Sequence, residues 1–107
     1  MIVKQAAKLA RFNTEKMGKC DLLSGKYLFS GLNAFEAGQV HAPHAHCDRD
    51  KLYVVLEGSG QLTIGDESQS VSPGDVALAP ADVEHSLANP GPARLVVMTV
   101  MAPPPGK

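Results

Sequence analysis

The chain lacks tryptophan and has few aromatic side chains and few cysteines. Aromatic residues occupy 5% of its 107 positions, so the stacking surfaces that usually hold nucleic-acid bases or sugar rings are scarce. The two cysteines, Cys20 and Cys47, are too few for a scaffold built on disulfides. These shortages exclude a small disulfide-rich domain, and we expect no nucleic-acid partner.

Long hydrophobic runs are also missing. The longest run, from Leu95 to Ala102, is interrupted by Thr99 and is far shorter than the roughly 18–20 residues that span a bilayer. The N-terminal residues contain no unbroken apolar stretch of the kind found in secretory signals. We therefore expect a soluble protein of the reducing cytoplasm, with no membrane partner.

Charge is low overall and unevenly distributed. The net charge is −1, but residues 1–26 carry six basic and two acidic side chains, a net charge of +4, which leaves −5 for residues 27–107. Such a basic arm more often packs against an acidic body, its own or that of a sister subunit, than it binds DNA. We expect the arm to be the element that is exchanged or packed across a homodimer.

Short apolar segments separated by glycine and proline fill the chain from Lys26 onward. The breaks recur roughly every eight to twelve residues, a spacing typical of a sandwich or barrel. The expected strands are residues 26–36, 38–46, 51–57, 60–64, 67–72, 75–79, 84–88 and 93–101. Because no long helix is available for a parallel crossover, the pattern predicts an all-β, antiparallel jelly roll.

The expected organisation has three parts. Residues 1–25 form an N-terminal arm, in which the alanine-rich stretch 3–12 is a short helix or a strand. Residues 26–102 form the barrel. The proline-rich residues 103–107 form a loose C-terminal tail.

Three of the four histidines lie within six residues, at His41, His44 and His46, and the fourth is His85. His44 and His46 are two positions apart, so on an extended strand they share a face, with Cα atoms roughly 6–7 Å apart. In a rolled-up sheet His85 can face them across the interior. Three neutral imidazoles make a facial ligand set for a divalent transition metal, with positions left open for water or substrate. The alternative is that these are surface or hydrogen-bonded histidines without a metal.

Two glycine-bounded segments hold these histidines at fixed intervals. In the first, the successive gaps are five, one, four and six residues between Gly38, His44, His46, Lys51 and Gly58. The second supplies Gly74, Pro80, His85 and Asn89. The two segments resemble the two motifs of the cupins. The resemblance implies a small single-domain cupin barrel, a bound divalent ion such as Fe, Mn, Ni or Zn, and the homodimer in which small cupins are commonly found.

Two positions depart from the cupin pattern. Asp82 replaces the glycine of the second motif, at a turn where aspartate tolerates unusual backbone angles. Lys51 stands at the position where, by the resemblance, the family has a glutamate that serves as a metal ligand. An ammonium 5 Å from a divalent ion is repelled by about 7 kcal/mol at an effective dielectric of about 20. Three outcomes remain open: Lys51 turns away and pairs with Asp48 or Asp50, it loses its proton, or the metal is absent.

Other side chains near the motifs are weaker candidates. Asp50 is a possible substitute ligand, but alternation points it to the face opposite Lys51 unless a bulge intervenes. Tyr53 shares the face of Lys51, and Glu84 is within reach as a base, so the catalytic candidates are Lys51, Tyr53 and Glu84. His41 has the opposite parity to His44 and is expected to be a bystander unless the neighbouring proline distorts the strand.

These features support three functions. The first is a small metal-dependent cupin, acting on or binding a small organic acid through its ion, which leaves open an oxygenase, isomerase or lyase activity. The second is a non-catalytic ligand-binding or sensing barrel in which Lys51 contacts an anionic ligand. The third is a structural or regulatory dimer whose pocket is vestigial.

Overall fold

The computed structural model describes residues 1–105 and contains one short 3-10 helix and nine strands. The helix is η1 (Ala6–Leu9). The strands are β1 (Gly18–Ser24), β2 (Phe29–Phe35), β3 (Val40–His44), β4 (Asp50–Glu57), β5 (Gly60–Ile64), β6 (Glu67–Val71), β7 (Val76–Ala79), β8 (His85–Ala88) and β9 (Leu95–Ala102). Residues 106–107 of the expected tail lie outside the described residues. No helix in residues 1–105 has the length and hydrophobicity needed to cross a membrane.

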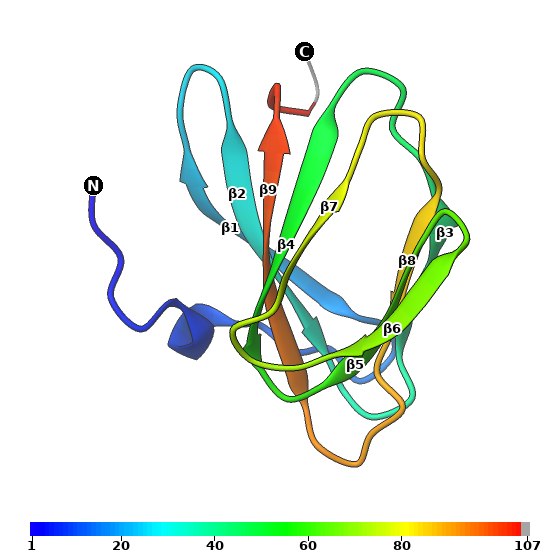
Figure 1. Ribbon diagram of the computed structural model, residues 1–107. Coiled ribbons are helices and arrows are strands. Elements are labelled where there is room, and N and C mark those ends of the chain that lie inside the picture. Colours follow the sequence, from blue (N-terminus) through cyan, green and yellow to red (C-terminus); the bar gives the residue numbers. More distant parts are fainter. Residues whose placement is uncertain (106–107) are drawn as a thin grey trace.

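Two sheets face each other and form the barrel (Figure 1). The five-stranded sheet has the order β1-β2-β9-β4-β7, and the four-stranded sheet has the order β3-β8-β5-β6. The strand pairs in both sheets are antiparallel. Strands distant in sequence are neighbours, as β2 and β9 are, which is the wrapping of a jelly roll. The all-β fold expected from the sequence is confirmed.

The N-terminal segment contains a strand that the sequence pattern did not indicate. Residues 6–9 form the helical alternative, η1, which lies against β9. Gly18–Ser24 forms β1, which pairs with β2 and has a register shift between Asp21 and Leu23. This edge strand alternates polar and apolar residues over few positions and begins with glycine, so its strand signal is weak. Its partner β2 starts at Phe29 because Gly25 and Leu28 close the intervening turn, where the Gly25 amide donates to the Leu28 carbonyl at 2.9 Å.

The side chains that fill the barrel interior change from apolar to polar along β4. Its inward side chains are Val55, Tyr53 and Lys51, which are 3%, 1% and 1% exposed. Across the sheet Val55 pairs with Val97, whereas Lys51 pairs with Met101. The Val55 end belongs to a continuous apolar core whose buried members are Met17, Phe35, Tyr53, Val55, Leu62, Ala79, Leu87, Leu95 and Val97. The Lys51 end opens onto the histidines.

Candidate metal centre

Strand pairing brings His44 and His85 together. His44 is the last residue of β3 and His85 the first of β8, and the two are directly paired in the β3–β8 ladder. Directly paired side chains on one face have Cβ atoms about 4.5–5.5 Å apart. The sequence pattern suggested that His85 approaches across the interior, but it comes from the neighbouring strand of the same sheet. His46 lies two residues beyond β3 and completes the group.

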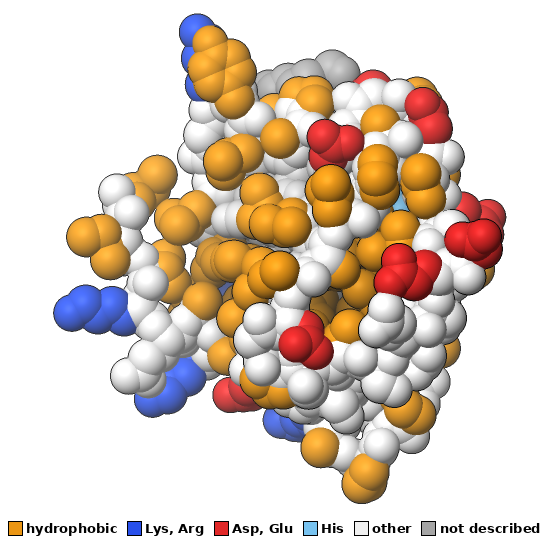
Figure 2. All heavy atoms as spheres, viewed as in Figure 1, with side chains coloured by type: hydrophobic (Ala, Val, Ile, Leu, Met, Phe, Trp, Pro, Cys, Tyr) orange, Lys and Arg blue, Asp and Glu red, His pale blue; other side chains and the backbone are white. Residues whose placement is uncertain are grey.

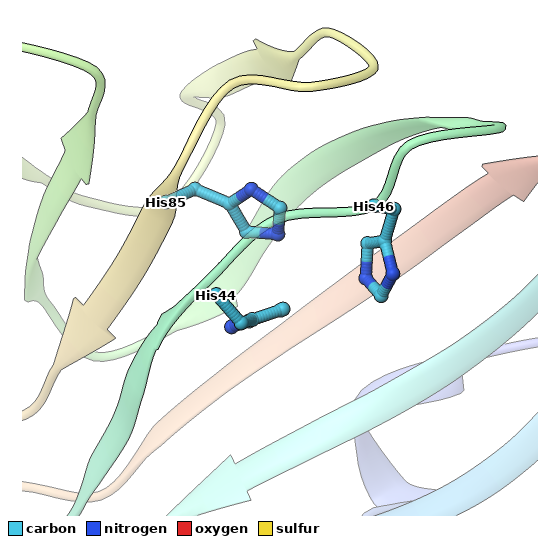
Figure 3. Close-up of side chains that lie close together, drawn as sticks. All are labelled: His44, His46 and His85. Carbon is cyan, nitrogen blue, oxygen red and sulfur yellow. The ribbon is translucent and has the colours of Figure 1, made fainter.

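The three rings surround a common space (Figure 3). One nitrogen from each of His44, His46 and His85 lies within 4.8 Å of the other two. The ring centroids are 4.2 Å apart for His44 and His85, 5.1 Å for His44 and His46, and 5.5 Å for His46 and His85. A zinc–nitrogen distance of about 2.0–2.1 Å places two ligand nitrogens roughly 3–3.5 Å apart. Small ring rotations are therefore enough to bring the three nitrogens onto one ion.

Backbone carbonyls hold two of the rings in the form that binds metal. His44 Nδ1 lies 2.8 Å from the Ala42 carbonyl oxygen, and His85 Nδ1 lies 3.0 Å from that of Val83. A carbonyl only accepts, so each Nδ1 carries the proton and donates it, and each Nε2 keeps its lone pair. His85 Nε2 is buried without a hydrogen-bond partner among the described residues. A divalent ion supplies the electron-pair acceptor that this buried nitrogen lacks, so the residues present fit a metal.

Burial favours the neutral form of two of the three histidines, His85 and His46. It lowers the pKa of His85 to about 4, although the bond to the Val83 carbonyl opposes the shift. Burial also lowers the pKa of His46, and the neighbouring His44 adds to the shift. Metal ions bind the neutral imidazole and compete with protons for it. At neutral pH no proton has to leave His85 or His46 before an ion binds.

The turn after β7 positions the loop that carries His46. Asp82 has φ +73, the left-handed region, and thus adopts the conformation that the cupin pattern assigns to glycine. Its amide donates to the His46 carbonyl at 2.7 Å. The expectation that Asp82 tolerates this turn is confirmed, and the bond ties the His46 loop to the segment leading into His85.

Lys51 points into the barrel. It is 1% exposed and lines a cavity of about 230 Å³ together with His44 and His46. Its Nζ lies 4.9 Å from the centroid of the Tyr53 ring. Burial lowers the pKa of Lys51 to about 8, and the charge of Lys19 adds to the shift. A lysine in the place of the family's glutamate therefore faces the histidines rather than solvent.

The carboxylates of Asp48 and Asp50, close to Lys51 in the sequence, bond to groups other than Lys51. Asp48 forms an ion pair with Arg49 at 3.0 Å, and Asp50 accepts a hydrogen bond from the Ala81 amide at 2.9 Å. Within residues 1–105 neither pairs with Lys51, which removes the first of the three outcomes considered above. Asp50 is exposed and is not a member of the histidine group, because β4 runs without a bulge at this point.

The catalytic candidates separate into two sets. Tyr53 lies inside, with its ring centroid 6.1 Å from that of His85 and its hydroxyl buried without a partner among the described residues. Burial raises the pKa of this hydroxyl. Glu84 is exposed and precedes His85, so strand alternation directs it to the other face. Lys51 and Tyr53 thus face the site, whereas Glu84 does not.

His41 lies closer to the site than strand parity predicts. A register shift between His41 and His44, a span that contains Pro43, breaks the strand alternation on which that expectation rests. Their ring centroids are 4.2 Å apart, and His41 Nδ1 is buried without a partner among the described residues. Burial and then the charge of Lys51 lower the pKa of His41 to about 3. The proline inside the strand was the available signal, because proline in a strand often marks an irregularity.

Fold and histidine set together define the class of protein. A sequence model of the cupin domain matches residues 31–101. This match covers more than half of the chain and includes all of the histidine group. The chain belongs to the cupin domain family.

Known proteins similar to this chain come from bacteria and an archaeon. An uncharacterized protein of Streptomyces coelicolor is 34% identical over 74 residues, 69% of each chain. One of Methanocaldococcus jannaschii is 31% identical over 61 residues, which are 57% of this chain and 49% of that protein, so the match spans about half of the archaeal relative. The crystal structure of the protein TT1209 from Thermus thermophilus superposes with a TM-score of 0.92 at 34% identity, covering 98% of this chain and 100% of that one.

Proposed function

We propose that this cupin holds a divalent transition-metal ion through His44, His46 and His85 and binds a small organic acid beside it. The Nε2 of His85, which is buried and has no hydrogen-bond partner within residues 1–105, carries the proposal, because a buried acceptor left without a partner costs free energy that an ion removes. The bound ion supplies a Lewis acid for a carboxylate or carbonyl oxygen. The Fe, Mn, Ni and Zn ions all accept imidazole ligands, so the residues do not distinguish among them.

Lys51 favours an anion over a neutral ligand. Its side chain lines the same cavity as His44 and His46, and it has no carboxylate partner within residues 1–105. A carboxylate lying between Lys51 and the histidine group is attracted from both sides once an ion is bound. Such an anion also screens the repulsion between the ammonium and the ion. We propose that Lys51 orients the organic acid.

Metal content tests the proposal directly. Protein purified without a nickel column is analysed by inductively coupled plasma mass spectrometry, as wild type, His44→Ala/His46→Ala and His41→Ala. His41 is the matched control, because it is a half-buried imidazole beside His44 that is not part of the group. We expect about one ion per chain in the wild type and in the control, and none in the double variant. An ion content near zero in all three, or unchanged in the double variant, contradicts the proposal.

The second candidate function is a barrel that binds anions without a metal. The inward, buried position of Lys51 favours it. Acetate binding that survives chelation and is lost in Lys51→Met supports this function, and acetate binding abolished by a chelator contradicts it. Lys26→Met is the matched control, because Lys26 also lies over a tyrosine ring, at 5.2 Å from the Tyr27 centroid, but is exposed.

We further propose a cytoplasmic homodimer that pairs through the outer face of the five-stranded sheet. Two cross-strand rows of apolar side chains lie on this face: Leu78, Leu52 and Val100, and Val76, Val54 and Met98. Val76 and Leu78 are 65% and 52% exposed, and Figure 2 shows hydrophobic side chains gathered over β9, β4 and β7. Contiguous exposed apolar surface of this kind is typical of protein interfaces.

Both cysteines are free, which supports the proposed cytoplasmic location, a reducing compartment.

Light scattering at micromolar concentration tests the dimer. We expect a dimer for the wild type and a monomer for Leu78→Asp. Ser70→Asp introduces the same charge at an exposed position of the other sheet and leaves the dimer intact. A monomeric wild type contradicts the proposed homodimer.

A further inference from the structure

A second cavity lies beside the histidine group, between the N-terminal segment and β3. Its volume is about 530 Å³, within the range of roughly 300–1,000 Å³ typical of small-ligand sites. Three cationic side chains line it, and its walls contain no aspartate or glutamate. The cationic residues are Arg11, Lys16 and Lys19. We call this space the arm cavity.

The wall of the arm cavity is fixed to the barrel. The Asn13 carbonyl accepts a hydrogen bond from Gln39 Nε2 at 2.7 Å, and the Arg94 guanidinium lies 4.2 Å from the centroid of the Phe12 ring. At Gly18 the backbones approach so closely that a Cβ atom meets the Arg11 carbonyl oxygen. The segment that carries Arg11 and Lys16 therefore lies against its own chain at several points, and the cavity is built into the fold.

The arm cavity adjoins the cavity of the histidine group. Lys19 and His41 line both. The His41 ring centroid lies 4.2 Å from that of His44, and His41 Nδ1 is buried without a partner among the described residues. His41 thus separates the two spaces and offers an unused polar atom at their boundary.

The charges around the arm cavity favour an anion. Glu36 is held by Arg94 through two bonds of 2.9 and 3.1 Å, so it does not neutralise the cavity's cations. Asp21 lines the neighbouring cavity rather than this one. Cations gathered around one space resemble the arrangement by which proteins bind phosphate and carboxylate groups.

We propose that the arm cavity is a subsite for an oxyanion, a phosphate or carboxylate group at the far end of a ligand whose other end lies at the histidine group. The placement of the ligand's second end rests on the proposed function. The subsite itself does not, because Arg11 and Lys16 line the arm cavity and not the cavity of the histidine group. The ligand class is a small organic acid with two anionic ends, and the arm cavity selects for the second.

Inorganic phosphate tests the subsite without a metal. In the presence of a chelator, phosphate is titrated into the isotopically labelled protein and followed by NMR. We expect the resonances of residues 11–19 and His41 to shift. Arg11→Ala/Lys16→Ala weakens the affinity about tenfold or more, since charge-assisted hydrogen bonds are lost. Lys4→Ala/Lys8→Ala is the matched control, because it removes the same charge from the same segment outside the cavity; its affinity stays within about twofold.

The outcomes separate the subsite from the metal. Phosphate binding that persists in His44→Ala/His46→Ala supports the subsite even if no ion is found in the wild type. Equal losses in the two double variants of the arm, or shifts spread over lysines throughout the chain, indicate only non-specific attraction to positive charge and overturn the proposal. Thermal melts of both arm variants check that these exposed substitutions leave the barrel folded.

Ligands with two anionic ends test the connection between the two spaces. 3-Phosphonopropionate and glutarate are titrated into the metal-loaded protein and compared with propionate. We expect at least one of them to bind about tenfold or more tightly than propionate, with the gain lost in Arg11→Ala/Lys16→Ala. Tighter binding of the phosphonate assigns the subsite to a phosphate-type group, and tighter binding of glutarate assigns it to a carboxylate. If neither exceeds propionate, the two spaces do not share one ligand, and the placement of the ligand's other end at the histidine group is overturned.

Discussion

The two ends of the barrel interior are made from the same strands and differ in the side chains that those strands point inward. On β9, Leu95 and Val97 face the apolar core, whereas Thr99 and Met101 face the histidine group. At the apolar end the buried polar side chain of Asn89 is satisfied, because its amide donates to the Phe35 and Ala93 carbonyls at 3.2 and 2.9 Å. The histidine end buries Lys51, which is 1% exposed, together with a tyrosine hydroxyl and a histidine nitrogen that have no hydrogen-bond partners among the described residues. Stability therefore comes from one end, and the other is arranged at a cost in stability for binding.

The largest expected effect is the loss of stability caused by a substitution in the apolar end. Phe35 is 0% exposed, and Phe35→Ala leaves a cavity in the core that costs about 3–5 kcal/mol of unfolding free energy. Urea denaturation followed by circular dichroism measures this loss. The folded fraction keeps its metal content, because Phe35 does not line the cavity of the histidine group. A loss below about 1 kcal/mol contradicts the assignment of stability to this end.

At the histidine end, replacing Lys51 is expected to raise the free energy of unfolding rather than lower it. Burial lowers the pKa of Lys51 from 10.5 to about 8, so the native state disfavours the ammonium. A group whose pKa falls on folding binds fewer protons in the native state, and stability rises with pH between the two values. The shift corresponds to about 3 kcal/mol. Metal-free Lys51→Met is therefore more stable than the wild type at pH 7, and the difference shrinks as the pH rises from 8 to 10.5.

Urea denaturation at three pH values, one below, one within and one near the top of this interval, measures the difference. Lys26→Met serves as control, because Lys26 is exposed. A Lys51 variant that is less stable than the wild type at neutral pH contradicts the view that this end costs stability. Equal pH dependence in the two variants contradicts it as well.

A bound metal ion is expected to offset the cost in stability of the histidine end and to leave the apolar end unaffected. An ion at 100 times its dissociation constant stabilises the native state by about 2.7 kcal/mol if it binds only the folded chain. Thermal shifts with Zn(II) and Mn(II) measure the gain. We expect it in the wild type and in Phe35→Ala, and we expect none in His44→Ala/His46→Ala. The same gain in that double variant indicates that the ion binds elsewhere.

The smallest effect concerns the turn beside the histidine end. Asp82 adopts φ +73, which glycine adopts without strain. Asp82→Gly is expected to stabilise the protein by about 0.5–1 kcal/mol, reduced by the greater freedom of glycine in the unfolded chain. Because the Asp82 amide still donates to the His46 carbonyl, the metal affinity stays unchanged. A fall in the melting temperature indicates that the aspartate side chain has a role of its own.

Much of the fold follows from local patterns, whereas the details of the site depend on strand register. Glycine and proline spacing indicated eight of the nine strands, and the two motifs brought His44, His46 and His85 together. The inward turn of His41 was not predicted, because it depends on a register shift that alternation ignores. The orientation of Lys51 was left open, because it depends on Asp48 and Asp50 having other partners.

The direct pairing of His44 with His85 links the histidine site to the order of folding. The two residues are 41 positions apart and meet only when β3 and β8 align in this register. Closing a loop of this length costs entropy before any contact offsets it. An ion that needs both nitrogens therefore binds after the four-stranded sheet has paired. A slip of two residues separates the pair by about 7 Å. The fraction of chains that hold an ion then counts the chains whose strands have paired correctly.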